Sequence, residues 1–453
     1  MQTEAVFHPG FRYLLQELTM DKKIDHAARK SRWSWYFYDF GNSAYASVVL
    51  LAVYSAYFKN VVVGGAEGTR LWGISVGIAA ILVAIISPVL GTIADFTKSK
   101  KRFLLIFTAI AIVFTALLFF VGKGDVFTGM LFFILAEIGY RAAQVFYDAL
   151  LTDVSTPESI GFVSGKGWAI GMVGGIIALL LVLVPIQLIG NHVIHYAFLI
   201  TAVFYLLSSI PAMLWVKEKY EAEKLPTGIN TINLAFKKLA QTFRSVKNYK
   251  EFIKYMIAFL IYNDGIMMLM DFAAIIGATL FGMQQTQLIM FVIVIQIAGT
   301  FGALLFGRFS DKKSSKEAII IALLILIASV SGLFFVKELT WFYVVGFLAG
   351  FSLSGVQAVS RTMVSQLAPS TKTAEFYGFL SVAGRTSTFV GPLVFGTLSY
   401  RANNWYINHG FEARLAEQYG LLWAVGSIIV FLVAGMIFLL VVKRVTAKDP
   451  IHY

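Results

Sequence analysis

The chain of 453 residues has no cysteine, only six histidines and only nine prolines, and charged residues make up just 14% of it. Without cysteine it can form no disulfide bond, thiolate metal site or iron–sulfur cluster. No histidine lies deep in an apolar segment, so we expect no bound metal and no cofactor. The charged fraction is far below the roughly one quarter that is usual in soluble domains. These shortages exclude thiol and zinc chemistry and argue against a soluble fold.

Apolar residues account for 58% of the chain, and they are gathered in long runs. A helix needs about 20 apolar residues to cross the hydrocarbon core of a bilayer. The stretches of suitable length lie near residues 34–58, 71–94, 103–121, 126–150, 161–184, 193–216, 255–281, 286–307, 317–336, 341–366, 375–399 and 419–442. The sequence therefore predicts an all-α membrane protein with twelve transmembrane helices.

The formal net charge of +12 is distributed unevenly between the expected loops. Of the 37 lysines and arginines, 27 fall in the N-terminal segment, the even-numbered loops or the C-terminal tail. Cytoplasmic loops of membrane proteins carry such an excess. We therefore expect both termini in the cytoplasm, and because the basic residues are explained by topology we expect no nucleic-acid partner.

Two polar segments lie outside the expected spans. Residues 1–32 are basic and contain no apolar core of signal-peptide length, so the first span should remain in the mature protein. Residues 217–254 divide the chain near its middle and carry one apolar helical stripe, formed by Ile232, Phe236, Leu239, Phe243 and Val246. This segment is expected to form an amphipathic helix that either lies on the inner membrane face or packs against the bundle.

The two halves of the chain resemble each other at a nearly constant offset of 216 to 225 residues. The corresponding pairs are Asp39 with Asp264, Gly91 and Asp95 with Gly307 and Asp311, Arg141 with Arg361, and Lys166 with Arg385. Two six-helix halves repeated in parallel resemble the architecture of the major facilitator transporters, which bind substrate between the halves near the bilayer midplane. We expect these halves at residues 33–216 and 255–444, with residues 1–32, 217–254 and 445–453 in the cytoplasm.

The loop 91–102 resembles the signature loop of the major facilitator superfamily, a glycine and an aspartate followed by a basic run. Gly91 would let helices approach closely, Asp95 could complement a helix N-terminus, and Arg102 belongs to the cations that could pair at a cytoplasmic gate. The second copy contributes Gly307 and Asp311. The loop departs from the signature at two positions, with Phe96 where a basic residue is usual and Lys98 where a glycine is usual. These departures leave open how the cytoplasmic gate is held closed.

Three motifs carry a closer resemblance. They are WYFYDFGNSAYA at residues 35–46, GKGW at 165–168 and FLIYNDG at 259–265. Together they are similar to the vacuole-effluxer family, which contains the yeast autophagy-related vacuolar amino-acid effluxer and many bacterial proteins. The resemblance covers the whole chain. It implies a twelve-helix secondary transporter, with amino acids as the implied solute and efflux as the implied direction.

Ionisable residues inside membrane spans are costly and therefore mark candidate functional sites. Span 4 carries Glu137, Arg141, Gln144 and Asp148, whose spacings of 4, 3 and 4 put them on one helical face. The stripe would form the polar wall of a transport path, with Glu137 near mid-membrane and Asp148 at the inner gate. The alternative is an internal ion pair that only fastens span 4 to a neighbour.

Two aspartates lie at corresponding positions in spans 1 and 7. Asp39 and Asp264 could each take up a proton during transport, or each could hydrogen-bond the start of a broken or closely packed helix beside Gly41 and Gly265. Polar residues nearby that could contact the solute are Tyr38, Asn42, Tyr262, Asn263 and, in span 10, Gln357. Asp271 lies deeper toward the outer side, and the sequence assigns it no role.

Three cations lie within other spans. Arg385 is too deep in span 11 to reach either membrane surface, so it should face the central cavity or an acidic partner such as Asp264 or Glu137. Lys166 and Arg361 lie nearer the cytoplasmic edge, where gate pairing or snorkelling to the headgroups is expected.

Glycine and tryptophan give two further expectations. Span 5 is rich in glycine, which favours close helix packing; the residues are Gly161, Gly165, Gly167, Gly171, Gly174 and Gly175. Tryptophans near span ends should face lipid or anchor the interfaces; they are Trp33, Trp35, Trp72, Trp215 and Trp341.

These features predict a secondary transporter whose halves rock around a central site, carrying a small polar solute, with amino acids and export expected. A zwitterion could place its carboxylate on Arg385 or Arg141 and its ammonium near Glu137 or Asp264. Open alternatives are a proton-coupled carrier of a lysolipid, sugar or peptide, and a transporter-like receptor. An enzyme is disfavoured because no histidine or cysteine lies within a span. We expect a functional monomer in a bacterial plasma membrane, since the loops are compact and no targeting extension is evident.

Overall fold

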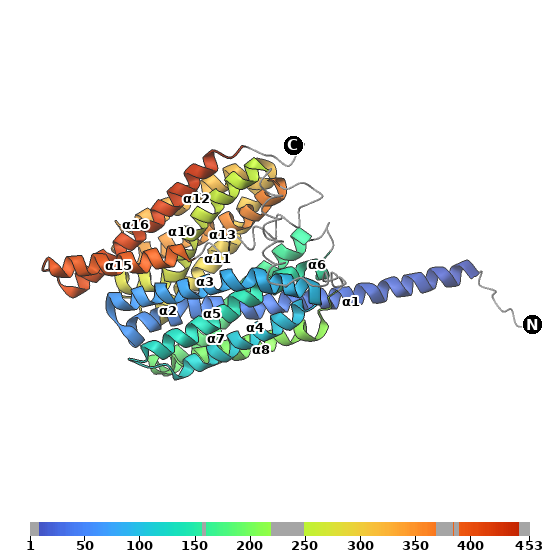
Figure 1. The fold of residues 1–453 in the computed structure, drawn as a ribbon, viewed down its shortest axis with the longest axis horizontal. Helices are drawn as coiled ribbons and strands as arrows, with labels where there is room; N and C mark the ends of the chain where they lie inside the picture. The colour runs from blue at the N-terminus through green and yellow to red at the C-terminus, as the bar shows by residue number, and fades with distance from the viewer. Residues whose placement is uncertain (1–8, 156–159, 219–248, 368–383, 385–388, 444–453) are drawn as a thin grey trace, which may run out of the picture.

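The structure is a computed structural model that describes residues 9–155, 160–218, 249–367, 384 and 389–443. Within these ranges every regular element is a helix. Figure 1 shows the long helices lying roughly side by side in one bundle, with α16, α12 and α10 leaning away from α4, α7 and α8. Long apolar runs produce this result because a helix satisfies all of its own backbone hydrogen bonds.

Six long helices and several short ones are described in the first half of the chain. The long ones are α1 (Pro9–Tyr45), α3 (Gly65–Thr97), α4 (Lys100–Leu117), α5 (Val126–Ala149), α7 (Ile160–Ile189) and α8 (Tyr196–Trp215). The short ones are η1 (Ala46–Ala52), α2 (Tyr54–Tyr57), η2 (Phe58–Val63), η3 (Leu118–Phe120), α6 (Leu151–Val154) and η4 (Asn191–Val193). Both η1 and η2 are π-helical, so the first span is wound as a π-helix in two places after α1 ends.

The described residues of the second half form six more long helices. They are α10 (Lys250–Phe281), α11 (Gln285–Lys312), α12 (Ser315–Gly332), α13 (Leu339–Leu367), α15 (Val390–Asn408) and α16 (Ala413–Leu440). Among the described residues, eleven helices are long and apolar enough to cross a membrane. About half of the span expected at 375–399 falls outside the described residues, and the amphipathic helix expected within 217–254 lies almost wholly outside them, so both stay predictions.

The helix contacts repeat between the halves. In the first half α1 packs against α7 and α8, α3 against α5, and α4 against α5 and α8. In the second half α10 packs against α15 and α16, α11 against α13, and α12 against α13 and α16. When the six long helices of each half are matched in order, every one of these contacts has its counterpart. The halves meet where α3 packs against α15 and where α7 packs against α11. Because α3 corresponds to α11 and α7 to α15, these two contacts are counterparts of each other.

Glycines on α7 explain why α7 and α1 lie so close together. A Cβ atom at Gly174 would collide with the backbone carbonyl of Phe40, and one at Gly171 would lie 2.6 Å from the Asp39 carboxylate. Gly167 likewise leaves room for the Trp35 ring. The close packing expected for this glycine-rich span is therefore present, and its partner is the helix that carries Asp39.

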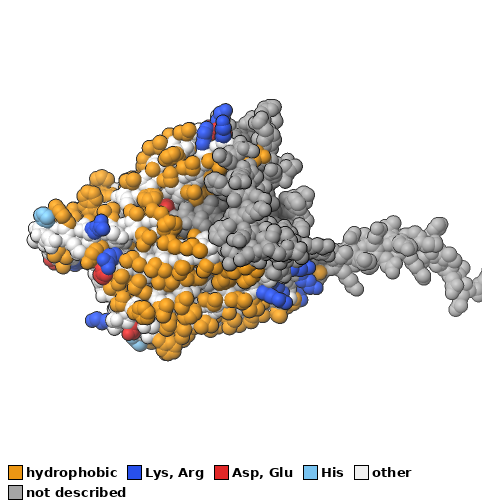
Figure 2. All heavy atoms as spheres, in the orientation of Figure 1, with side chains coloured by type: hydrophobic (Ala, Val, Ile, Leu, Met, Phe, Trp, Pro, Cys, Tyr) orange, Lys and Arg blue, Asp and Glu red, His pale blue; other side chains and the backbone are white. Residues whose placement is uncertain are grey.

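The flank of the bundle is apolar, with charged side chains toward its two ends in Figure 2. Trp33, Trp215 and Trp341 are exposed there, as expected for tryptophans at the lipid boundary. The same expectation is wrong for Trp35 and Trp72, which are 3% and 0% exposed. Both indoles instead make buried hydrogen bonds, Trp35 to the carbonyl of Tyr147 and Trp72 to that of Asp271, because a position near a span end does not fix which side a residue faces.

Candidate functional site

The bundle has two ends, which the connecting turns define. We use "outer end" for the end whose turns contain Gly64, Gly124, Gly190, Gly282 and Gly410, and "inner end" for the opposite one, with residues 98–99 and 313–314. The distribution of lysine and arginine predicts that the inner end faces the cytoplasm.

A buried ion pair lies within α5. Glu137 is completely buried and Arg141 is 7% exposed, and the Arg141 Nε donates a hydrogen bond to Glu137 Oε1. The Tyr45 hydroxyl, at the end of α1, lies beside the same carboxylate. Since two charges buried from water are tolerated only when they are paired and hydrogen-bonded, this arrangement holds both side chains in fixed positions.

Asp271 of α10, in the second half of the chain, interacts with this ion pair. Its side chain is 2% exposed, and its charge interacts with those of Arg141 and Glu137. Its backbone carbonyl accepts a hydrogen bond of 2.8 Å from the Trp72 indole of α3. The sequence assigned Asp271 no role. Helical periodicity shows on which face of α10 Asp271 lies, but not which helix packs against that face.

Asp264 extends the group of charges along α10. It lies seven residues before Asp271, hence on the same face, and the two carboxylates interact electrostatically. Among the described residues, three carboxylates and one guanidinium therefore share this central region, to which we refer as the central cluster: Glu137, Arg141, Asp264 and Asp271. Its excess of negative charge suits a cationic group or a proton.

A group of amide side chains lies next to the central cluster in the second half. Gln357 of α13 donates to the Asn263 side-chain oxygen at 3.1 Å, and the Asn263 amide donates to the carbonyl of Gly384 at 3.4 Å. Asp264 accepts a hydrogen bond from the backbone N–H of Gly391 at 3.4 Å. The candidates Asn263, Asp264 and Gln357 are thus brought together where α10, α13 and α15 converge.

A small cavity of about 90 Å³ lies toward the inner end. It is lined by Trp35, Asp39, Gln144, Tyr147, Asp148, Ser164, Trp168 and Arg361. Arg361 of α13 donates to the Ser164 hydroxyl of α7 at 3.1 Å and lies 5.2 Å from the Trp168 ring centre. The charges of Asp39 and Asp148 interact with each other, and Asp39 interacts with Arg361. Residues of both halves therefore meet here, and we call them the inner cluster.

Two of the polar candidates hydrogen-bond to aspartate or tyrosine side chains. Asn42 is buried and hydrogen-bonds Asp39 one turn away. The Gln144 amide donates to the Tyr140 hydroxyl at 2.8 Å. Gln144 belongs to the inner cluster, and Asn42 lies on α1 between Asp39 of that cluster and Tyr45 beside Glu137.

The remaining tyrosine and lysine candidates are engaged within a single half of the chain. The Tyr38 hydroxyl hydrogen-bonds Thr108 at 2.7 Å and Tyr205 at 2.8 Å, and the Tyr262 hydroxyl bonds Ser360 at 2.8 Å. Both tyrosines are fully buried. Lys166 places its ammonium 4.8 Å from the centre of the Trp33 ring, which belongs to the same half.

Some gate candidates are only partly described. Arg385 lies outside the described residues, as do the side chains of Asp95 and Asp311, and the surroundings of Gly91 are not described. Arg102 is exposed near the start of α4. A Cβ atom at Gly307 would meet no described atom within 4 Å, so this glycine makes no close contact with another described helix.

The outer end is fastened by contacts between the halves that the sequence did not reveal. Lys59 of η2 forms an ion pair with Glu417 of α16, and the Gln285 amide of α11 donates to the carbonyl of Ala52 at 2.6 Å. A Cβ atom at Gly73 of α3 would collide with the Pro392 carbonyl of α15. These contacts close the outer end. They join segments that lie far apart in the sequence, so the sequence alone does not reveal them.

Comparison with known proteins adds independent evidence. The sequence profile of the family described as "Vacuole effluxer Atg22 like" matches residues 71–159 and 155–416. The uncharacterized MFS-type transporter YxiO of Bacillus subtilis is 27% identical over 432 residues, which cover 93% of this chain and 96% of YxiO. Autophagy-related protein 22 of Yarrowia lipolytica is 25% identical over 278 residues, 55% of this chain and 47% of the fungal protein. A bacterial homolog of the human lysosomal transporter Spinster, solved in an inward-facing and unoccupied conformation, superimposes with a TM-score of 0.65 at 13% identity, covering 92% of this chain and 96% of that one.

Proposed function

The chain belongs to the family of Atg22-like vacuole effluxers, and from this premise we propose that it exports a small polar solute by alternating access. The family membership confirms the resemblance predicted from the span motifs. The all-helical major facilitator fold predicted from the sequence is confirmed as well. The chain is thus a multi-pass integral membrane transporter of the major facilitator type. We propose, in addition, the class of solute, the direction of transport and its coupling to protons.

The observation that carries the proposal is a buried cluster of mixed charge built by both halves. Arg141 and Glu137 come from α5, and Asp271 comes from α10. A guanidinium offers paired donors that suit a carboxylate, while the carboxylates of the cluster suit an ammonium group. A zwitterionic amino acid carries both groups on one carbon, so it can contact both halves at once.

In this proposal the solute enters the transporter past the inner cluster. The outer end is closed by Lys59, Glu417 and Gln285, whereas the small cavity lies toward the inner end. A solute arriving from the inner side would separate Arg361 from Ser164 before it reaches the central cluster. Release on the outer side then requires the outer contacts to open.

Proton coupling is part of the same proposal. Asp264 is buried, receives one backbone hydrogen bond and forms no ion pair with a described cation. A carboxylate in such surroundings is costly to keep charged, and proton uptake removes this cost. Asp264 therefore serves as the proposed proton site, while Glu137 is engaged by Arg141.

Solute counterflow in proteoliposomes tests the proposal. Vesicles holding the purified chain and an unlabelled amino acid are placed in a trace of the labelled form, across a panel of amino acids. We expect saturable uptake for at least one of them, and acceleration of export by an opposing pH gradient. If no amino acid exchanges with folded protein, the solute class is wrong, and sugars, peptides and lysolipids are tested next on the same vesicles.

A further inference from the structure

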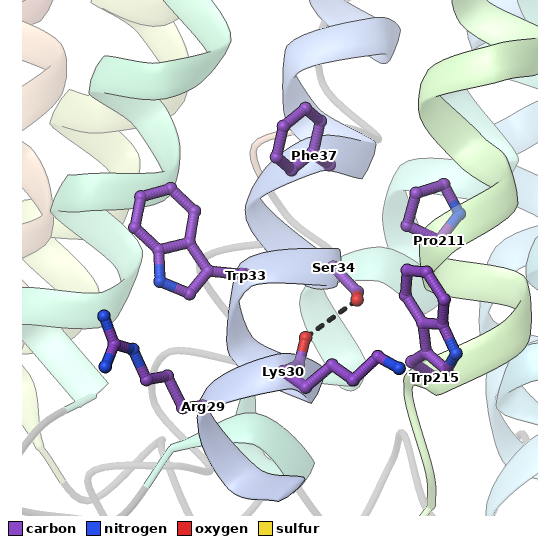
Figure 3. Close-up of a pocket in the computed structure, with 7 residues that line it drawn as sticks. All are labelled: Arg29, Lys30, Trp33, Ser34, Phe37, Pro211 and Trp215. Carbon is purple, nitrogen blue, oxygen red and sulfur yellow. Dashed lines mark hydrogen bonds between the residues drawn. The ribbon is translucent and has the colours of Figure 1, made fainter. Parts of the chain in front are cut away.

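A second candidate binding site lies on the flank of the bundle, away from the central cluster. It is a groove of about 570 Å³ between α1 and α8 near the inner end. It is lined by Arg29, Lys30, Trp33, Ser34, Phe37, Pro211 and Trp215. Figure 3 shows the Trp33 and Trp215 side chains on opposite sides of α1, with Phe37 farther along the same helix.

The chemistry of the groove changes in a fixed order along α1. Arg29 and Lys30 come first, Trp33 follows about one turn later, and Phe37 about one turn after that. At 1.5 Å per residue, Lys30 and Phe37 are separated by roughly 10 Å along the helix axis. The order of cation, indole and phenyl ring corresponds to the headgroup, glycerol region and acyl chain of a phospholipid that enters from the inner side.

The two cations at the start of the groove are available to an anion. Both side chains are exposed, and neither forms an ion pair with an acidic side chain described among residues 27–155, 160–218, 249–367 and 389–443. The Lys30 ammonium lies 3.9 Å from the Trp215 ring centre, which holds it at the edge of the groove. Lys166 approaches Trp33 from α7 and adds a third positive charge nearby.

The apolar part of the groove opens on the surface that faces lipid. Phe37 is 44% exposed, and the outward face of α8 beside the groove exposes large aliphatic side chains, including Leu207, Ile210 and Leu214. Such a surface is unfavourable in water but favourable against acyl chains. A free phosphate ion would use only the cations and leave the rings uncovered, and an acidic peptide would meet a hydrocarbon environment.

We propose that this groove binds one anionic phospholipid of the inner leaflet. Arg29 and Lys30 hold its phosphate, the Trp33 and Trp215 indoles flank the glycerol region, and an acyl chain lies along Phe37. The cytoplasmic leaflet supplies negatively charged lipids, and juxtamembrane cations are attracted to them. The inference depends on the expected orientation of the inner end but not on which solute the central cluster binds.

Native mass spectrometry of the full chain in detergent tests the lipid site. Phosphatidylglycerol and phosphatidylcholine with identical acyl chains are titrated separately into wild type and into an Arg29→Gln/Lys30→Gln variant. We expect wild type to bind phosphatidylglycerol at least about tenfold more tightly than phosphatidylcholine, since roughly 1 kcal/mol per cation corresponds to a fivefold or greater preference for each. The double variant should lose this preference.

A matched control removes two exposed cations of the same end that lie outside the groove. Lys250→Gln/Lys313→Gln should keep the preference for phosphatidylglycerol, which would show that net charge alone does not explain it. Glycerol phosphate, which has the anion but no acyl chain, should fail to displace the lipid. The proposal is overturned if the Arg29→Gln/Lys30→Gln variant retains the preference, if the control loses it equally, or if glycerol phosphate competes.

Quenching of tryptophan fluorescence gives a second measurement that does not depend on the charge variant. Phosphatidylglycerol with brominated acyl chains should quench wild type more than a Trp33→Phe/Trp215→Phe variant, because these indoles flank the groove. Equal fractional quenching in both proteins would place the lipid elsewhere and contradict the proposal.

Discussion

Glu137 and Arg141 form an ion pair that the sequence could predict, because a spacing of four residues places them on one face of α5. Spacing could not distinguish a purely structural pair from one that contacts a solute. Asp271 bears on that distinction, since a structural pair within one helix needs no third charge from the opposite half. Asp271 could not be assigned from sequence, because the residue facing it lies in a distant segment of chain.

Replacing Glu137 tests which role the pair has. Glu137→Gln removes the carboxylate that accepts the Arg141 hydrogen bond and leaves the buried Arg141 beside Asp271, which should lower stability by up to about 3–5 kcal/mol and abolish counterflow. The melting temperature of the purified protein and the initial rate of counterflow measure the two effects separately.

A paired apolar replacement separates stability from transport. Glu137→Leu/Arg141→Met removes both charges of the pair together, so it should recover part of the lost stability, although Asp271 loses the Arg141 charge beside it. If the pair contacts the solute, counterflow stays at least about tenfold below wild type even though the protein is stable. Recovery of both stability and transport would mean that the pair is structural.

Helix α7 shows what the sequence reveals about an element. Its glycines predicted close packing, and the structure identifies α1 as the partner, with Gly171 against Asp39 and Gly174 against Phe40. The glycine spacing marks a small-residue face, but any of several helices could occupy it. The identity of the neighbour depends on how all the helices pack together.

A single methyl group on α7 should disturb this packing. Gly174→Ala places a Cβ against the Phe40 carbonyl, where backbone cannot move aside easily, and should cost about 1–3 kcal/mol. The melting temperature should fall accordingly. Gly426→Ala on α16 is the matched control, because the nearest described atom would be 3.9 Å away and alanine is the better helix former. A smaller loss at Gly174 than at Gly426 would contradict the packing assignment.

At the scale of the whole molecule, composition and apolar runs were sufficient to predict an all-helical membrane bundle, and the repeated motifs predicted two related halves. The helix contacts repeat between those halves as expected of a duplicated unit. The contacts that close the outer end, such as Lys59 with Glu417, could not be predicted. Neither residue belongs to a motif, and they meet only because two segments far apart in sequence lie together.

Alternating access is the central claim, and cross-linking the outer end tests it most directly. Because the chain contains no cysteine, Lys59→Cys/Glu417→Cys would carry its only two thiols. A short bis-methanethiosulfonate reagent can join them, dithiothreitol can release them, and each single-cysteine variant serves as a control for modification alone. Counterflow of the solute is measured before cross-linking, after it and after release. We expect the cross-link to stop counterflow and reduction to restore it, whereas full-rate transport by the cross-linked protein would show that the outer end need not open.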